Sequence, residues 1–197
     1  QRVIDWQNRG RSVDFRGHRI HVFEQEGEGL PLVMLHGFPS SSYDWQPLID
    51  RLEGRRILAF DFLGFGLSDK PRNHVYSLAW QADLADELVR STFPNEPVSL
   101  LAHDMGTSVA TELFARDLER KLGFDIDGAL LFNGSIVLAK ASLTRSQKVL
   151  RSRFGGLAAK FSSERIFKRE FGAIFSPDHP LSPDEAADQW SLIGYND

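Results

Sequence analysis

The sequence contains no cysteine, which excludes disulfide bonds, thiolate metal sites and cysteine nucleophiles. Long hydrophobic runs are also missing. The apolar run Leu32–Leu35 is far shorter than the roughly 18 residues that a membrane-spanning helix needs. The segment Gln1–Arg11 is polar and lacks the apolar core of a signal peptide. We therefore expect a soluble, cytoplasmic protein and no membrane association.

An excess of basic charge is absent as well. The chain of 197 residues has 23 Lys and Arg against 27 Asp and Glu, a formal net charge of −4. No nucleic-acid partner is expected from this balance. The hydrophobic fraction of 42% and the charged fraction of 25% are typical of a globular domain with one sizeable core.

Four continuous apolar runs are typical of strands that are buried on both faces. They are Leu30–Leu35, Arg56–Phe60, Val98–Ala102 and Gly128–Phe132. A hairpin precedes them, with predicted strands Ser12–Phe15 and His18–Glu24. Helical periodicity covers Leu78–Phe93 and Met105–Leu118. This alternation predicts an α/β fold with a mostly parallel sheet.

The pattern changes after Ile136. Between Lys140 and Glu170 lie nine basic and two acidic residues, with helical apolar spacing and no buried-strand pattern. We interpret the basic run as a solvated helix face, and attraction to an anionic substrate or membrane surface is the alternative. Ser182 to Glu185 forms a capping box, and Gly194 is a candidate C-cap. The prediction is a core in residues 1–136 and a helical cap in residues 137–197.

The most informative segment is Ala102–Gly106, between a predicted strand and a predicted helix. It has the form of a nucleophile elbow, with Asp104 where G-x-S-x-G enzymes place serine. Ala102 and Gly106 supply the small neighbours that the tight turn needs. The helix N-terminus favours an ionised carboxylate. An aspartate that only caps the helix is the alternative.

A second segment, His36-Gly37-Phe38-Pro39, follows the first predicted parallel strand. In enzymes with a nucleophile elbow, this loop and the residue after the nucleophile each lend a backbone N–H to the oxyanion hole. Here those donors would be Phe38 and Met105. We interpret His36 and His103 as supporting residues, and an ordinary Gly-Pro turn is the alternative.

The third segment, Asp61–Pro71, contains two glycines that suggest a nucleotide loop. Asp69, however, stands where G-x-G-x-x-G has its third glycine, and no Walker lysine pattern is present. We therefore predict no cofactor, and no metal site.

Together, the three segments resemble the α/β-hydrolase superfamily in its epoxide hydrolase and haloalkane dehalogenase branch. Leu35–Trp45 and Asp61–Gly66 closely resemble the mesoderm-specific transcript family within it. The resemblance implies an α/β-hydrolase fold with a helical cap. It also implies a histidine base after an eighth strand and an acid after the sixth or seventh. Because Gly128–Phe132 would be the sixth, we expect residues 1–136 to be the N-terminal part of the core and residues 137–197 an incomplete cap of a longer protein.

An aspartate nucleophile limits the chemistry. Attack on an ester would give a high-energy anhydride, whereas attack on an sp³ carbon gives a stable alkyl ester. Dehalogenases of this branch hold the halide with a Trp after the nucleophile and an Asn or second Trp. Met105 and Phe38, which stand at the first Trp and the Asn positions here, have no side-chain donor. An epoxide hydrolase-like enzyme is therefore preferred, with a haloalkane dehalogenase, a non-catalytic binding protein or an inactive fragment as alternatives.

The expected ligands are a small apolar substrate and water. Aromatic residues of the predicted cap support an apolar substrate, although packing is the alternative for most of them. Trp190 is a candidate hydrogen-bond donor from the cap, and Tyr195 is the one tyrosine beyond the elbow. Both are candidate pocket residues. The oligomeric state is left open.

Overall fold

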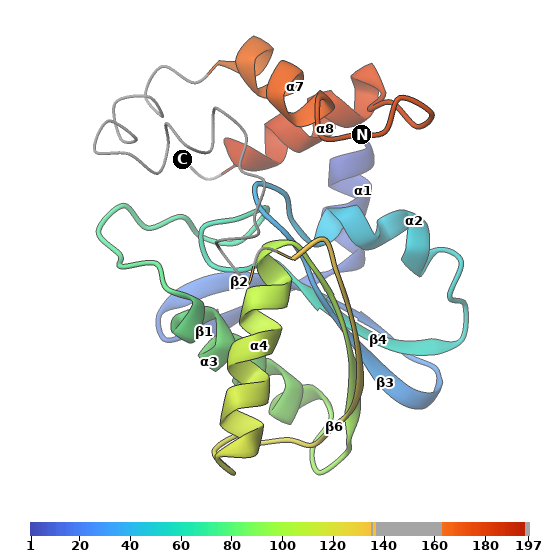
Figure 1. Cartoon of the computed structure of the whole chain (residues 1–197). Helices are drawn as coiled ribbons and strands as arrows, with labels where there is room; N and C mark the ends of the chain where they lie inside the picture. Colours follow the sequence, from blue (N-terminus) through green and yellow to red (C-terminus); the bar gives the residue numbers. More distant parts are fainter. Residues whose placement is uncertain (135, 137–162, 196–197) are drawn as a thin grey trace.

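The computed structural model describes residues 1–134, 136 and 163–195, so most of the predicted basic cap segment lies outside the described residues. A six-stranded sheet forms the centre, in the order β1-β2-β4-β3-β5-β6. The antiparallel hairpin β1–β2 joins β4, and β4, β3, β5 and β6 run parallel. The predicted α/β fold with a mostly parallel sheet is confirmed (Figure 1). The strands are β1 (Arg11–Phe15), β2 (His18–Gln25), β3 (Glu28–Leu35), β4 (Arg55–Phe60), β5 (Val98–His103) and β6 (Ile126–Phe132).

Helices pack on both faces of the sheet and beyond the carboxyl ends of its parallel strands (Figure 1). The described helices are α1 (Arg2–Arg9), the 3-10 helix η1 (Ser42–Trp45), α2 (Gln46–Ile49), α3 (Leu78–Thr92), α4 (Met105–Leu118), α7 (Glu164–Gly172) and α8 (Pro183–Ile193). Local signals set several of their ends. The Ser77 side chain caps α3 at the Trp80 N–H, and the Ser182 side chain caps α8 at the Glu185 N–H. The predicted Ser182 cap and the C-cap at Gly194 are confirmed, whereas the reciprocal bond of a capping box, from the Ser182 N–H to the Glu185 side chain, is not formed.

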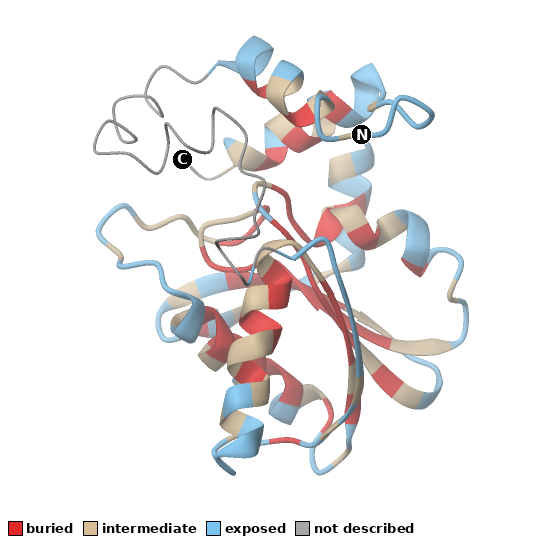
Figure 2. Ribbon diagram, in the orientation of Figure 1, coloured by how far each residue is buried: buried red, intermediate tan, exposed pale blue. Residues whose placement is uncertain are grey.

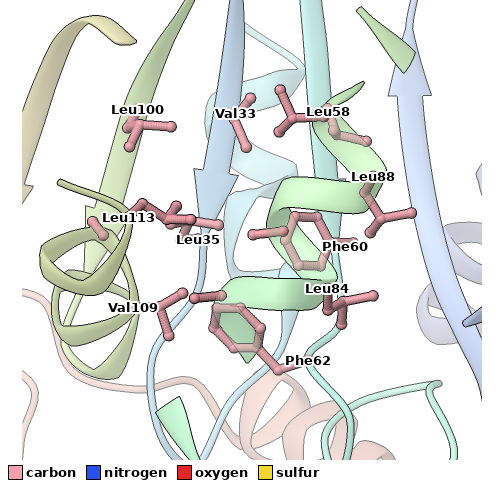
Figure 3. Close-up of a cluster of buried hydrophobic side chains, with 14 of the residues drawn as sticks. Val33, Leu35, Leu58, Phe60, Phe62, Leu84, Leu88, Leu100, Val109 and Leu113 are labelled. Atoms are coloured by element: carbon pink, nitrogen blue, oxygen red, sulfur yellow. The ribbon is translucent and has the colours of Figure 1, made fainter. Parts of the chain in front are cut away.

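Alternate residues of the central strands face two separate cores, because side chains alternate along a strand. On one face, Val33, Leu35 and Leu58 pack with helices α3 and α4 (Figure 3). On the other face, Met34 and Ile57 pack with α1, η1 and α2. The buried residues lie on the sheet and on the sides of the helices that face it (Figure 2). This double burial explains the continuous apolar runs of β3, β4 and β5.

Two features are not evident from the local sequence pattern. The polar N-terminal segment forms helix α1, which is anchored by Trp6, a fully buried side chain stacked on Phe23 with 4.9 Å between ring centroids. Strand β6 has the apolar pattern of a strand buried on both faces, yet Leu130 is 63% and Phe132 37% exposed. It is the edge strand of the described sheet, and an apolar cavity of about 430 Å³ lies between it and Leu48 of α2. Among the described residues, no helix is long and apolar enough to cross a membrane.

Candidate active site

Asp104 lies at the turn between β5 and α4, with φ 47° and ψ −116°. This conformation is rarely adopted by a residue with a side chain, and it projects the residue out of the strand-to-helix path. The Asp104 N–H donates to the Phe132 carbonyl at 3.2 Å, and the Asp104 carbonyl accepts from the Thr107 N–H at 3.0 Å. The turn is therefore held from both sides, by β6 and by the first turn of α4.

Two glycines make room for this turn. A Cβ on Gly106 would lie 2.3 Å from the Leu35 carbonyl oxygen, so α4 could not begin so close to β3 with a larger residue. A Cβ on Gly37 would lie 2.7 Å from the Cβ of Asp104. The structure thus explains physically why the motifs need small residues at these two positions.

The backbone nitrogen of Phe38 lies 3.4 Å from Oδ2 of Asp104, and its N–H donates to that carboxylate. Pro39 follows through a cis peptide bond. Met105 is the first residue of α4, and its N–H is one of the helix N–H groups that have no intrahelical acceptor. The two predicted oxyanion donors therefore come from different segments, Phe38 from the loop after β3 and Met105 from the start of α4.

His36 is fully buried beneath this loop. Its Nδ1 donates to the Gly37 carbonyl at 2.8 Å, and its Nε2 accepts from the Phe62 N–H at 3.0 Å. These partners define the Nδ1–H tautomer, and burial lowers the pKa of the imidazole, which keeps it neutral. Because both ring nitrogens are engaged, His36 supports the loop and is not placed to act as a base.

His103 precedes the candidate nucleophile and is half-buried. Its Nε2 lies 3.4 Å from the Asn133 amide nitrogen, and its ring lies against Phe132. Desolvation lowers the pKa of His103, while the Asp104 charge opposes that shift. Among the described residues, which include all six histidines, no ring is hydrogen-bonded to the Asp104 carboxylate. Within the same ranges, no group of acidic or histidine side chains is placed to hold a metal.

Asp61 is a structural residue of the site whose role the sequence analysis missed. It is fully buried, and its carboxylate accepts from the Ser42 N–H at 2.7 Å, the Ser42 hydroxyl at 2.5 Å and the Leu67 N–H at 2.6 Å. It thereby ties the loop after β3, which carries Phe38, to the loop after β4. The sequence feature that could have indicated this role is the position of Asp61 directly after a buried strand and ahead of Gly64 and Gly66.

The two candidate pocket residues of the cap do not lie together at Asp104. Trp190, on α8, packs on Phe167 of α7 with 5.6 Å between ring centroids. The Tyr195 hydroxyl accepts from the Gln7 side-chain amide at 2.8 Å, and its ring packs with the α1 side of the core. The structure therefore provides no contact between either side chain and the candidate nucleophile.

Comparison with known proteins agrees with this geometry. The sequence pattern of the alpha/beta hydrolase fold family matches residues 31–129, and the chain belongs to this family. LipZ of Mycobacterium tuberculosis is 50% identical over 99% of this chain and 67% of its own length. The human mesoderm-specific transcript homolog protein is 36% identical over 98% of this chain and 60% of its own length. The predicted family resemblance is confirmed.

Solved structures with the same fold include dehalogenases and an epoxide hydrolase. The haloalkane dehalogenase DatA from Agrobacterium tumefaciens superposes with a TM-score of 0.74 at 27% identity, covering 95% of this chain and 63% of DatA. The epoxide hydrolase CorEH has a TM-score of 0.70 at 24% identity, covering 93% of this chain and 67% of CorEH, and this likeness supports the fold alone. The chain therefore spans about 60–67% of these relatives.

Proposed function

We propose that this α/β-fold hydrolase opens small epoxides through a covalent ester on Asp104. The observation that carries the proposal is the elbow itself, which holds a carboxylate in a rarely adopted backbone conformation beside the Phe38 N–H. A carboxylate that attacks an ester would form an anhydride, whereas attack on an sp³ carbon forms an ordinary alkyl ester. The identity of the nucleophile therefore favours epoxides and alkyl halides over esters and peptides.

In the first step, an Asp104 oxygen would form a bond to one epoxide carbon while the bond from that carbon to the epoxide oxygen breaks. The electron pair stays on the oxygen, which takes a proton from water and becomes a hydroxyl group. In the second step, water attacks the ester carbonyl, and the N–H groups of Phe38 and Met105 stabilise the negative charge on its oxygen. The attacking water gives one proton to the hydroxide left by the first step. The bond from the carbonyl carbon to the alcohol oxygen then breaks, and that oxygen takes the water's second proton, which gives a diol and restores the Asp104 carboxylate.

A haloalkane dehalogenase is the second candidate, because DatA and a 30% identical haloalkane dehalogenase of Agrobacterium fabrum are among the relatives. Halide departure needs hydrogen-bond donors for the leaving ion. Phe38 and Met105 have no side-chain donor, and Trp190 lies against Phe167. An epoxide needs only a proton for its oxygen, which favours epoxide opening. A non-catalytic binding protein is a further alternative, favoured by the lack of a described histidine bonded to Asp104.

The test is covalent capture. After incubation with a small terminal epoxide, the intact mass should rise by the mass of the epoxide, and the added group should map to the peptide that contains Asp104. Asp104→Asn is the matched control, because it keeps size and shape but removes the nucleophilic charge. Equal labelling of the Asn variant, or labelling of another residue alone, would contradict the proposal.

A further inference from the structure

A cavity of about 510 Å³ is lined by both residues that supply the proposed oxyanion donors, Phe38, whose N–H donates to the Asp104 carboxylate, and Met105, which follows Asp104 in the chain. The rest of its described wall comes from the segment between β4 and α3, which includes Phe65 and Tyr76, and from the first turn of α3, which includes Leu78. This segment extends beside the sheet as the teal loop at the left of Figure 1. The wall is mainly apolar, so the cavity suits a hydrocarbon chain that leads to Asp104.

The charges around this cavity have one sign. Among the described residues that line it, Lys70 and Arg72 are cations and none is a carboxylate. Lys70 is held in place, because its Nζ donates to the carbonyls of Gly66 and Tyr195 at 2.6 Å each. Arg72 is exposed and forms no ion pair with a described Asp or Glu.

Another cavity, of about 220 Å³ against α8, is more polar and shows the contrasting arrangement. It also contains an arginine, Arg2, but this guanidinium is paired with Asp188 at 2.7 Å and Asp184 at 3.3 Å. Its positive charge is therefore balanced by the protein. At the cavity lined by Phe38 and Met105, no carboxylate among the described residues balances the charge of Arg72.

The wall that carries Arg72 is also braced. The Tyr76 hydroxyl donates to the Pro71 carbonyl at 2.9 Å. The His74 ring contacts Tyr76 and Trp80, with centroid distances of 5.0 and 5.1 Å. These contacts restrain the backbone on both sides of Arg72. Ligand binding therefore costs less conformational entropy in this segment.

Building on the proposed function, we propose that this cavity selects electrophiles whose apolar chain ends in a carboxylate. Arg72 binds the carboxylate, the aromatic wall contacts the chain, and the reactive carbon lies at Asp104. A guanidinium suits this role because its planar array of donors matches the two carboxylate oxygens. Arg72 is then a specificity-determining residue and takes no part in the bond changes.

The experiment uses the full 197-residue chain and a series of terminal epoxides of increasing chain length. Each epoxide is prepared as the carboxylic acid and as its neutral primary amide, and the rate of Asp104 alkylation is followed by intact mass. At the chain length that spans the cavity, the acid should react about twofold to fivefold faster than the amide, the range expected for an exposed ion pair. Added salt should reduce this ratio.

Arg72→Met should reduce the ratio of the acid rate to the amide rate to one or below, whereas Arg72→Lys should keep part of it. Arg51→Met is the matched control, because Arg51 is an exposed arginine outside this cavity. The ratio of the acid rate to the amide rate in this variant should equal the ratio in the unchanged chain. A ratio near one at every chain length, or one that survives Arg72→Met, would overturn the inference while the proposed function stands. If neither acid nor amide alkylates Asp104, the proposed function fails and the inference fails with it.

Discussion

The backbone at Asp104 should store strain that a glycine would release. A residue with a Cβ held at φ 47° and ψ −116° costs on the order of 1–3 kcal/mol. Asp104→Ala and Asp104→Gly both remove the carboxylate, and they differ only in the Cβ. Glycine gives back roughly 0.5–1 kcal/mol, because its unfolded chain is more flexible. The Gly variant should therefore be more stable than the Ala variant by about 1 kcal/mol, which corresponds to roughly 2–4 °C in Tm for a chain of this size.

The assay is urea unfolding of the two variants, followed by the fluorescence of the four tryptophans. Equal m-values would show that both variants expose the same surface on unfolding, so that a difference in midpoint reports stability alone. An Ala variant as stable as the Gly variant, or more stable, would refute the strain argument. The elbow would then be an unstrained turn, although the Asp104 side chain still makes no hydrogen bond that caps α4.

Two further predictions concern chemistry. Bromoalkanes should alkylate Asp104 more slowly than small apolar epoxides by roughly two to four orders of magnitude. The reason is that the halide lacks two charge-assisted hydrogen bonds of ~1.5–3 kcal/mol each. Bromide release at a rate comparable to diol formation would reverse this ranking. The 197-residue chain should be alkylated once without turning over, because both ring nitrogens of His36 are engaged. A general base raises the rate of such a hydrolysis roughly 10²–10⁴-fold. Multiple turnovers by a preparation of confirmed mass would show that one of the histidines of the chain is the base.

The parts of the structure that depend on local sequence could be predicted. Continuous apolar runs identified the central strands, since both faces of β3 and β5 are covered. The serine caps at Ser77 and Ser182 act within their own helices and were recognisable from spacing alone. The elbow was predictable for the same reason, because Asp104 and Gly106 belong to one short motif.

The parts that depend on distant contacts could not be predicted. Helix α1 is polar apart from a few side chains, and its position depends on Trp6 packing against β2 and η1. The bond between Gln7 and Tyr195 joins residues 188 positions apart, so a substrate-pocket role for Tyr195 could not be weighed against it. The exposure of Leu130 depends on what covers the sheet edge, which the composition of β6 does not reveal.

One of these distant contacts leads to a pH prediction. Gln189 of α8 donates to the Asp44 carboxylate of η1 at 2.6 Å, and burial, aided by the charges of Glu185 and Asp61, raises the pKa of Asp44 to about 6. The unfolded chain loses this proton near the ordinary aspartate pKa of 3.8, so the folded state binds the additional proton between that value and about 6.

The contribution of Asp44 to stability should therefore fall as pH rises through this window, by at most about 3 kcal/mol, and should level off above it. Asp44→Asn has no proton to lose and keeps an oxygen that can accept from Gln189. The difference in unfolding free energy between the unchanged chain and this variant, measured by urea unfolding across the window, should move in favour of the variant as pH rises. Because every other titrating group is common to both proteins, their contributions cancel in the difference. A difference that stays constant with pH would show that Asp44 ionises as it does in water, and that the contact between α8 and the core is open to solvent.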